Sequence, residues 1–340
     1  MNNSLKPLLE IVANGVSLSV DDAESAFDII MSGEATESQI GAFLMALRVR
    51  GETVEEITGA VRSMRAKSNK IKAPEGAIDI VGTGGDGAHT LNISTASAIV
   101  VAGCGVPVAK HGNKAASSKS GSSDVLDALG VNLDADFSLI EQAIDQAGIG
   151  FLMAQRHHPA MRFVGPSRAE LGTRSIFNLL GPLTNPATVR RQFTGVFARE
   201  WIEPMAQVLK TLGSEACWVV HGADGLDELS TVTSSWVAQL KDGEITTFEV
   251  SPDEAGLPFA TAEDLRGDDP SYNAAEILKL LDGVPGAFRE VVLYNAAAAL
   301  LVAGNVTNLK DGVGMAAQAI DSGKSKSSLE QLVKITNSRS

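Results

Sequence analysis

The chain of 340 residues is 44 % hydrophobic and carries 28 Lys and Arg against 41 Asp and Glu, which gives a formal net charge of −13 at pH 7. An acidic surface repels phosphate backbones, so this balance excludes a general electrostatic surface for DNA or RNA. An anionic ligand must therefore be held by a local cluster of basic residues and backbone N–H groups.

The N-terminal segment, residues 1–70, shows only helical patterns. Ser19 is placed to cap one amphipathic helix, and the capping-box patterns TESQ at 36–39 and TVEE at 53–56 each begin another. A further helix is expected around residues 5–13, before the first of these. The pattern predicts a helical bundle without chemistry of its own.

Short apolar strands alternate with helices from Ala77 onwards. This alternation is typical of an α/β fold with a mostly parallel sheet flanked by helices, and such sheets bind ligands at the carboxyl ends of their strands. The polar stretch RGDDPSYN, residues 266–273, is predicted to be a loop. The predicted strands are 78–81, 106–109, 149–153 and 217–221, and the predicted helices begin near 94, 123, 137, 202 and 274.

A glycine-rich turn follows the first predicted strand. The sequence DIVGTGGDGAHTLNIST, residues 79–95, runs from the strand through four glycines to the start of a helix. Backbone N–H groups of such a loop and of the helix N-terminus can converge on an anion, as in a phosphate site. The spacing matches neither the dinucleotide-binding nor the Walker pattern, and on its own it is more often merely a tight turn.

Polar loops follow two other predicted strands. KHGNKAASSKSGSSD, residues 110–124, combines three lysines and a histidine with serines, and GADGLDELS, residues 222–230, contains the adjacent acids Asp227 and Glu228. Two neighbouring carboxylates suit Mg²⁺, which takes one or two carboxylates together with substrate phosphates. Each loop by itself is typical of a solvated surface, but three such loops at strand ends favour a shared phosphate and metal site.

Motifs along the whole chain resemble the anthranilate phosphoribosyltransferase family. They are GTGGD (82–86), NIST (92–95), KHGN (110–113), SSKSGS (117–122), HPAM (158–161), ELGTRSIFNLLGPLTNP (170–186), GLDELS (225–230) and NAAAAL (295–300). The related pyrimidine nucleoside phosphorylases resemble the chain only around the first glycine loop, so the combination is specific. The resemblance implies a fold like that of the class II nucleoside phosphorylases, in which a smaller all-helical domain stands beside the α/β domain with a cleft between them.

The resemblance implies transfer of the 5-phosphoribosyl group of 5-phosphoribosyl 1-pyrophosphate (PRPP) to the amine of anthranilate, the second step from chorismate to tryptophan. The aniline nitrogen is already nucleophilic and Mg²⁺-bound pyrophosphate leaves readily, so positioning and electrostatic stabilisation supply most of the rate and no covalent nucleophile is expected. The alternatives are a pyrimidine nucleoside phosphorylase-like enzyme and a non-catalytic member of the fold that binds nucleic acid. The net charge and the acid pair argue against the second alternative.

The resemblance also implies roles for individual residues. Among the anthranilate residues, Arg168 can pair the carboxylate through two N–H groups. Anthranilate would be bound by Gly82, His111, Asn113, His158, Arg168, Gly181 and Pro182, and two Mg²⁺ per subunit by Ser94, Asp227 and Glu228. PRPP would be held by Gly82, Gly85, Asp86, Thr90, Asn92, Ile93, Ser94, Thr95, Lys110, Asn113, Lys114, Ala115, Ala116, Ser117, Ser118 and Ser122. Lys114 departs from the usual family pattern, as do Met153, Gln155, Arg156 and Phe163 along the expected anthranilate entrance.

The resemblance implies a homodimer formed through the helical domain, and the apolar residues Phe43, Leu44 and Leu47 would suit that contact. No targeting sequence is evident, and the two cysteines lack the spacing of a metal site or a disulfide framework, so a cytoplasmic enzyme without a membrane partner is expected. The expected helical domain is 1–70 joined by about 168–190, and the expected α/β domain, which binds PRPP, is 71–167 with 191–340.

Overall fold

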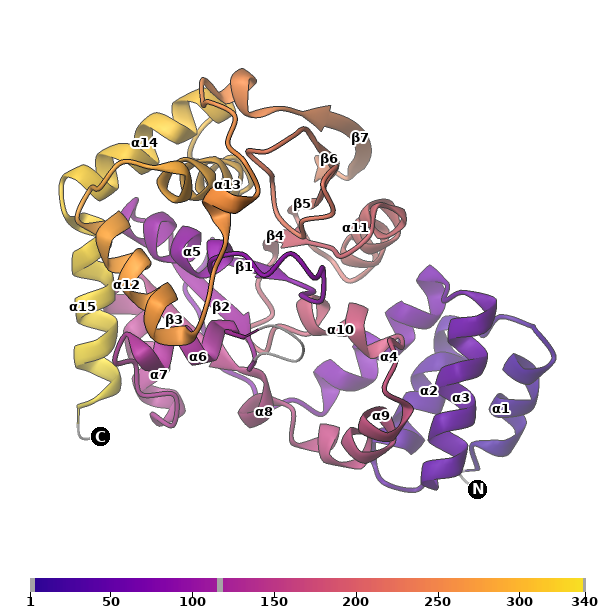
Figure 1. Cartoon of the computed structure of the whole chain (residues 1–340). Helices are drawn as coiled ribbons and strands as arrows, with labels where there is room; N and C mark the ends of the chain where they lie inside the picture. Colours follow the sequence, from indigo (N-terminus) through magenta and orange to yellow (C-terminus); the bar gives the residue numbers. More distant parts are fainter. Residues whose placement is uncertain (1–3, 115–118, 339–340) are drawn as a thin grey trace.

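The computed structural model describes residues 4–114 and 119–338. Within this part, four helices at the N-terminal end form a bundle that stands to one side of the sheet in Figure 1: α1 (Lys6–Ala13), α2 (Val20–Met31), α3 (Glu37–Arg50) and α4 (Val54–Ala66). Their starts are fixed locally, because Ser19 accepts a hydrogen bond from the N–H of Asp22, and Thr36 and Thr53 each form a capping box. The predicted helical bundle is confirmed.

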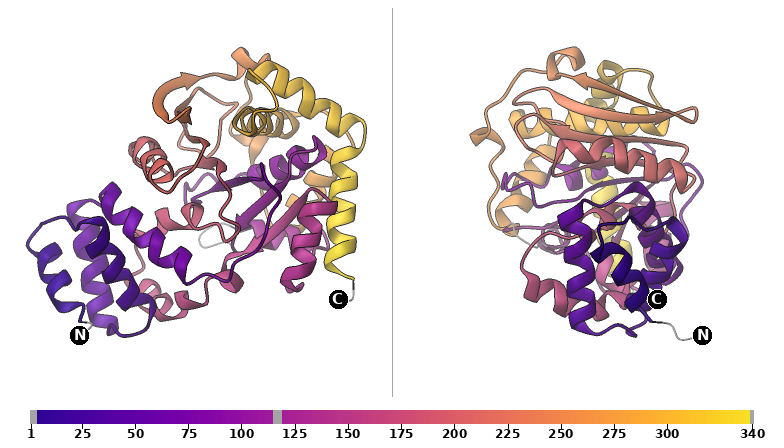
Figure 2. Two further views of the ribbon diagram at one scale, coloured as in Figure 1. Left: turned by 180° about the vertical axis from the view of Figure 1, so that it is seen from behind. Right: turned by 90° about the vertical axis from the view of Figure 1, so that its right-hand side faces the viewer.

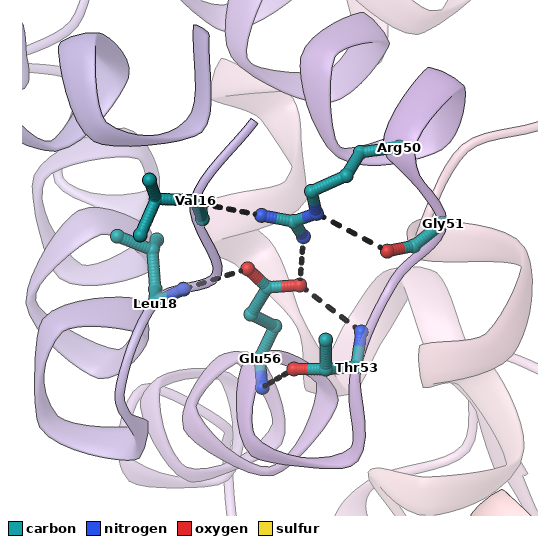
Figure 3. A network of polar contacts seen from close by, with 6 residues as sticks. All are labelled: Val16, Leu18, Arg50, Gly51, Thr53 and Glu56. Atoms are coloured by element: carbon teal, nitrogen blue, oxygen red, sulfur yellow. Dashed lines mark hydrogen bonds and ion pairs between the residues drawn. The ribbon is translucent and has the colours of Figure 1, made fainter. Parts of the chain in front are cut away.

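A buried carboxylate joins the loops between these helices (Figure 3). Glu56, at the start of α4, accepts from the N–H of Leu18 at 2.9 Å and from that of Thr53 at 3.0 Å, and it pairs with the guanidinium of Arg50. Arg50 in turn donates to the carbonyl oxygen of Val16 at 2.7 Å. Both oxygens of Glu56 have donors, so the burial of this charge is compensated.

The described residues form one seven-stranded sheet in the order β3-β2-β1-β4-β5-β6-β7. Strands β1 to β5 pair in parallel, and β6 and β7 are antiparallel. The chain builds outward from β1 to β3 and then returns to place β4 on the other side of β1, so the topological switch point lies between β1 and β4. The strands are β1 (Ile78–Gly82), β2 (Val108–Gly112), β3 (Ile149–Met153), β4 (Arg191–Gly195), β5 (Ala216–Gly222), β6 (Ser235–Lys241) and β7 (Glu244–Val250).

Helices cover both faces of the sheet (Figures 1 and 2). Two consecutive residues of β5 show this: Val220 belongs to the apolar core that includes Ala297 of α13, whereas Val219 belongs to the core that includes Met205 of α11. The helices of this part are α5 (Ile93–Gly103), α6 (Ser122–Ala128), α7 (Phe137–Gln146), α11 (Ile202–Thr211), α12 (Pro270–Leu281), α13 (Ala287–Ala303), α14 (Leu309–Asp321) and α15 (Lys324–Thr336), with short 3-10 turns at η2 (Arg199–Trp201), η3 (Pro252–Ala255) and η4 (Glu263–Leu265).

After β3 the chain leaves the sheet and packs on the helical bundle. It forms α8 (Ala154–His157), the 3-10 turn η1 (Pro159–Phe163), α9 (Gly165–Leu171) and α10 (Phe177–Leu183) before it returns as β4. Phe177 lies edge to face with Phe27 of α2, with ring centroids 5.7 Å apart, and Leu180 is buried in the same apolar cluster. The core of the bundle is therefore completed by residues from a distant part of the chain.

Several expected elements differ from the structure. The second strand begins at Val108 and continues past the expected end at residue 109, because the polar residues Lys110 and His111 are buried inside it. Helix α12 begins at Pro270, so the prediction of a loop over 266–273 is wrong for its last four residues; Asp269 caps this helix. Strands β4, β6 and β7 are not among the predicted strands.

The prediction that Phe43, Leu44 and Leu47 form the contact surface of a dimer is also wrong. Phe43, Leu44 and Leu47 are fully buried inside the bundle of a single chain, so they are not available to a partner. No helix of the described residues is both long and apolar enough to cross a membrane.

Candidate active site

Three carboxylates meet at the switch point of the sheet. Asp86 lies in the loop after β1, Asp227 and Glu228 lie in the loop after β5, and one oxygen of each is within 4.8 Å of the others. The N–H of Gly84 donates to the Asp227 carboxylate at 2.7 Å, and the N–H of Asp227 faces the Asp86 carboxylate at 3.4 Å. The two expected metal ligands of the β5 loop are thus joined by Asp86, which the family resemblance assigns to PRPP.

Two glycines permit this close approach of loops. A β-carbon on Gly195, at the end of β4, would lie 1.4 Å from the carbonyl oxygen of Asp227, and a β-carbon on Gly82, at the end of β1, would lie 2.6 Å from the Asp227 carboxylate. A side chain at either position would displace the acidic loop. Gly195 is not singled out by any sequence motif, because its importance depends on a residue of another loop.

Burial raises the pKa values of Asp227 and Glu228. Desolvation, together with the charge of Asp86, raises the pKa of Asp227 from its ordinary 3.8 to about 7. Desolvation and the charges of Asp227 and Asp86 raise the pKa of Glu228 well above its ordinary value. No ion pair of the described residues involves these three carboxylates. A hard divalent cation with oxygen ligands would offset their mutual repulsion, so the residues present fit Mg²⁺.

A buried lysine lies beside the acids. Lys110 of β2 is 2 % exposed, and its ammonium donates to the carbonyl oxygen of Ile80 at 2.6 Å and to Ser94 Oγ at 3.4 Å. Burial lowers the pKa of Lys110 from 10.5 to about 8, although nearby carboxylates oppose the shift. The side chain therefore remains mostly protonated at pH 7, next to Ser94 at the N-terminus of α5.

Asp79 is a buried carboxylate to which no motif assigns a role. It accepts from the N–H of His111 at 3.0 Å and from the side-chain amide of Asn185 at 2.7 Å. Asn185 also donates to the carbonyl oxygen of Ala109 at 2.8 Å, so Asp79 joins β1, β2 and the segment after α10. The signal in the sequence is an acid within an apolar strand, which requires a buried partner.

His111 and His158 lie together, with ring centroids 5.2 Å apart. Nδ1 of His111 is 3.0 Å from the carbonyl oxygen of Gly181, which can only accept, so Nδ1 carries the proton; Nε2 is buried and has no hydrogen-bond partner among the described residues. Burial lowers the pKa of His111 well below 6.5 and that of His158 to about 4, so both rings are neutral at pH 7. Three expected anthranilate residues are thus adjacent, and Pro182 follows in α10.

Two arginines lie on the segment that crosses to the bundle. The guanidinium of Arg168, on α9, lies 5.3 Å from the ring centroid of Phe177, and no hydrogen bond within the described residues joins it to His111 or Asn113. Arg174, to which the sequence assigns no role, donates to the carbonyl oxygen of Gly85 and covers the ring of Phe197 at 4.2 Å. Arg174 thereby ties the loop after α9 to the glycine loop.

The other expected PRPP residues lie at two places. Thr90, Asn92, Ile93 and Thr95 are at or just before the N-terminus of α5, where Ile93 and Thr95 are buried. Ser122 Oγ donates to the carbonyl oxygen of Asn113 at 3.2 Å, and the N–H of Lys114 donates to Asn113 Oδ1 at 2.9 Å, so these residues form one loop after β2. The expected residues Ala115, Ala116, Ser117 and Ser118 lie outside the described residues.

The residues that depart from the family pattern have structural contacts of their own. Arg156 donates to the carbonyl oxygens of Leu133 and Ala135 at 2.9 and 2.6 Å, and Phe163 packs against Gly33 of the helical bundle. These contacts direct both side chains to neighbouring loops rather than to His111 and His158.

Two family models match the chain. One describes the a/b domain of a glycosyl transferase family and matches residues 74–326, and the other describes the helical bundle domain of a glycosyl transferase family and matches residues 6–68. The two matched ranges correspond to the part that contains the sheet and to the N-terminal helices.

Curated relatives and solved structures match over nearly the whole chain. The anthranilate phosphoribosyltransferase of Rhodospirillum rubrum is 60 % identical over 98 % of this chain and 96 % of its own, and that of Azospirillum brasilense is 61 % identical over 98 % and 94 %. The crystal structure of the enzyme from Thermus thermophilus has a TM-score of 0.92 at 41 % identity, covering 97 % of this chain and 99 % of its own. The Saccharomyces cerevisiae enzyme in complex with PRPP and Mg has a TM-score of 0.91 at 28 % identity, covering 100 % and 99 %.

Proposed function

We propose a catalytic arrangement for this chain from the premise that it belongs to the anthranilate phosphoribosyltransferase family. The enzyme transfers the 5-phosphoribosyl group from PRPP to the amine of anthranilate and releases pyrophosphate, and it uses Mg²⁺. It is a pentosyltransferase of tryptophan biosynthesis. The phosphorylase and nucleic-acid-binding alternatives are disfavoured, because relatives that match almost the entire chain carry the transferase name.

The buried acidic cluster beside Lys110 is the observation that carries the arrangement. We infer that Asp227, Glu228 and Ser94 hold two Mg²⁺ per subunit, with Asp86 in the same cluster. Bound Mg²⁺ would neutralise the charge of pyrophosphate and so make it a better leaving group. The raised pKa values mean that the carboxylates must lose protons to bind the metal, which links metal affinity to pH.

PRPP would lie across the carboxyl end of the sheet. Gly82 ends β1, Gly85 lies in the loop that follows, and Thr90, Asn92 and the N-terminus of α5 come next, so backbone N–H groups and small polar side chains line one edge. The ammonium of Lys110 would attract the phosphate groups, and Asn113, Lys114 and Ser122 would lie over them. These residues bind and orient PRPP; none is required to form a covalent bond.

Anthranilate would lie near His111, Asn113 and Arg168. The unpartnered Nε2 of the neutral His111 can accept a hydrogen bond from the amine and so orient its lone pair toward the ribose, and Arg168 can pair with the carboxylate. His158, Gly181 and Pro182 complete the surroundings. The guanidinium of Arg168 lies over the ring of Phe177 and forms no hydrogen bond with His111 in the described part of the chain, so we propose that closure of the helical part on the sheet brings it to the substrate.

We propose the domain division 1–70 with about 168–190, and 71–167 with 191–340. The edge-to-face contact of Phe177 with Phe27 of α2 supports the assignment of the segment 168–190 to the helical part. A homodimer through the helical domain is proposed from the family resemblance, with exposed residues such as Val49 of α3 as the contact in place of the buried Phe43. The two free cysteines suit a reducing compartment, so we propose a cytoplasmic location.

The decisive experiment mixes the purified protein with anthranilate, PRPP and Mg²⁺ and follows the loss of anthranilate fluorescence. A decay that requires all three components is expected. If PRPP binds in calorimetry while anthranilate fluorescence does not decay, the acceptor site is wrongly assigned; if PRPP does not bind, the assignment of the sheet edge is wrong as well.

A further inference from the structure

Asn273, at the start of α12, connects two loops of the proposed PRPP site. It is 1 % exposed, its side-chain N–H donates to Asn92 Oδ1 at 2.9 Å, and its side-chain carbonyl accepts from the backbone N–H of Asp268 at 2.9 Å. Asn92 also accepts from Ser120 Oγ at 3.1 Å and donates to the backbone carbonyl of Ser120 at 3.3 Å. The two amides thus link α12, the N-terminus of α5 and the loop after β2.

The backbone groups at the two ends of this series of hydrogen bonds, the N–H of Asp268 and the carbonyl of Ser120, fix the direction of each bond between them. The backbone N–H of Asp268 can only donate, so the side-chain group of Asn273 that faces it must be the carbonyl, and the opposite side of Asn273 must present N–H groups. The backbone carbonyl of Ser120 can only accept, so it faces the NH₂ group of Asn92. The amide orientations therefore follow from chemistry, although oxygen and nitrogen have similar sizes.

The segment that carries Asn273 is itself held against the start of α5. The N–H of Gly267 donates to the carbonyl oxygen of His89 at 2.9 Å, and the N–H of Leu91 donates to that of Leu265 at 2.9 Å. These backbone bonds lie three positions and one position before Asn92 on the chain, so they hold the segment that leads to Asn273 next to Asn92.

We propose that Asn273 is a positioning residue that turns the Asn92 amide so that an N–H, and not the carbonyl oxygen, faces bound PRPP. The inference rests on the proposed role of Asn92 as a PRPP ligand. Both lone pairs of Asn92 Oδ1 are occupied by Asn273 and Ser120, whereas one of its two side-chain N–H groups has no acceptor among the described residues. PRPP carries phosphate oxygens that need donors, and a carbonyl facing them would repel them.

The test compares Asn273→Asp with Asn273→Ala. In Asn273→Asp the acceptor for Asp268 is kept and the donor to Asn92 becomes an acceptor, so the Asn92 amide turns its carbonyl toward PRPP; in Asn273→Ala, Ser120 still holds the amide. We expect the KM for PRPP to rise about tenfold in Asn273→Asp and about threefold in Asn273→Ala, while the KM for anthranilate stays within about twofold of the parent. A role in packing alone gives the opposite order, because alanine leaves a cavity and aspartate does not.

Two controls separate orientation from charge. Asp268→Asn removes a carboxylate that lies close to Asn273 but keeps the backbone N–H that bonds to Asn273. This variant should leave the KM for PRPP unchanged. The larger rise in the KM for PRPP in Asn273→Asp than in Asn273→Ala should also persist at high salt, because salt screens long-range repulsion but does not restore a reversed hydrogen bond. If high salt removes the excess, or if Asn273→Asp is milder than Asn273→Ala, the proposal is wrong.

A milder variant keeps the test available if Asn273→Asp does not fold. Ser120→Ala removes the second donor to Asn92 Oδ1 and should raise the KM for PRPP about threefold without changing that for anthranilate; an unchanged KM for PRPP would contradict the proposal. Asn92→Ala distinguishes the two levels of inference. If it leaves PRPP binding intact, the assignment of Asn92 itself fails; if it weakens PRPP binding while the Asn273 variants do not, only the role of Asn273 fails.

Discussion

Glu56 in the helical bundle and Glu228 at the sheet are both buried glutamates, and their surroundings are opposite. Glu56 has two backbone N–H donors and the guanidinium of Arg50 for its two oxygens (Figure 3). Glu228 has two other carboxylates within 4.8 Å, and the ammonium of Lys110 donates instead to Ile80 and Ser94. A buried acid with a full set of donors stabilises the fold, whereas buried acids grouped together remain unfavourable until a ligand binds.

The largest effect is expected from removal of the grouped acids. The double variant Asp227→Ala, Glu228→Ala should lose activity by about a thousandfold or more, because without the bound metal the negative charge of the leaving pyrophosphate is no longer neutralised. Its Mg²⁺ dependence should vanish, and its free energy of unfolding without Mg²⁺ should not fall, since uncompensated charges are removed. Steady-state assays over a Mg²⁺ titration measure the metal dependence, and denaturant unfolding measures the free energy of unfolding. If the variant responds to Mg²⁺ like the parent, the metal binds elsewhere.

Removal of the paired acid should act on stability instead. Glu56→Ala leaves the N–H groups of Leu18 and Thr53 without their acceptor and removes the carboxylate that neutralises Arg50, so the free energy of unfolding should fall by about 3 kcal/mol, with little change in kcat of the folded enzyme. Urea unfolding followed by circular dichroism provides the measurement. A variant as stable as the parent would mean that the pair is not needed for the bundle.

Arg168 extends the comparison to a half-buried basic residue that forms no ion pair with the described carboxylates. Arg168→Ala should reduce the use of anthranilate by roughly ten- to a hundredfold, the loss of a charge-assisted hydrogen bond worth about 1.5 to 3 kcal/mol, while PRPP binding stays nearly unchanged. Arg162→Ala is the matched control, because Arg162 lies over the ring of Phe163, which packs against the helical bundle. Equal losses for both substrates would contradict the assigned role.

The smallest effect is expected from protonation of the acidic cluster. The pKa of Asp227 is raised from 3.8 to about 7, so the native state binds protons more tightly than the unfolded chain between these values. The stability of the metal-free enzyme should therefore fall as pH rises from about 4 to 7, and a difference on the order of 1 kcal/mol would lower Tm by roughly 2 to 4 °C. Saturating Mg²⁺ should remove this slope; a Tm that rises with pH over the same range would contradict the raised pKa. Calorimetry at several pH values provides the measurement.

Features set by neighbouring residues are the ones that sequence predicts well. The caps at Ser19, Thr36 and Thr53 each depend on a residue three positions away, and the strand Ile149–Met153 is continuously apolar. All four predicted elements are confirmed. The acids of the β5 loop are recognisable because two carboxylates are adjacent in the chain.

Features set by distant partners are not predictable in the same way. Asp79 has its amide partner 106 positions away, the Gly195 contact depends on the loop after β5, and Asn273 meets Asn92 across 181 positions. Local polarity gives the wrong answer for 270–273, where a helix begins, and for Lys110, which is buried within a strand despite its charge. In each case the tertiary structure supplies the hydrogen-bond partner that the local sequence lacks.

The completion of the bundle core by Phe177 and Leu180 has a consequence for synthesis on the ribosome. The four N-terminal helices emerge first, but the face of Phe27 that Phe177 covers stays open until α10 has been made, more than a hundred residues later. At about 5 to 20 residues per second, this interval lasts on the order of ten seconds. The first part of the chain to be translated is therefore not the first to reach its native packing, and the nascent bundle must avoid association with other apolar surfaces during that time.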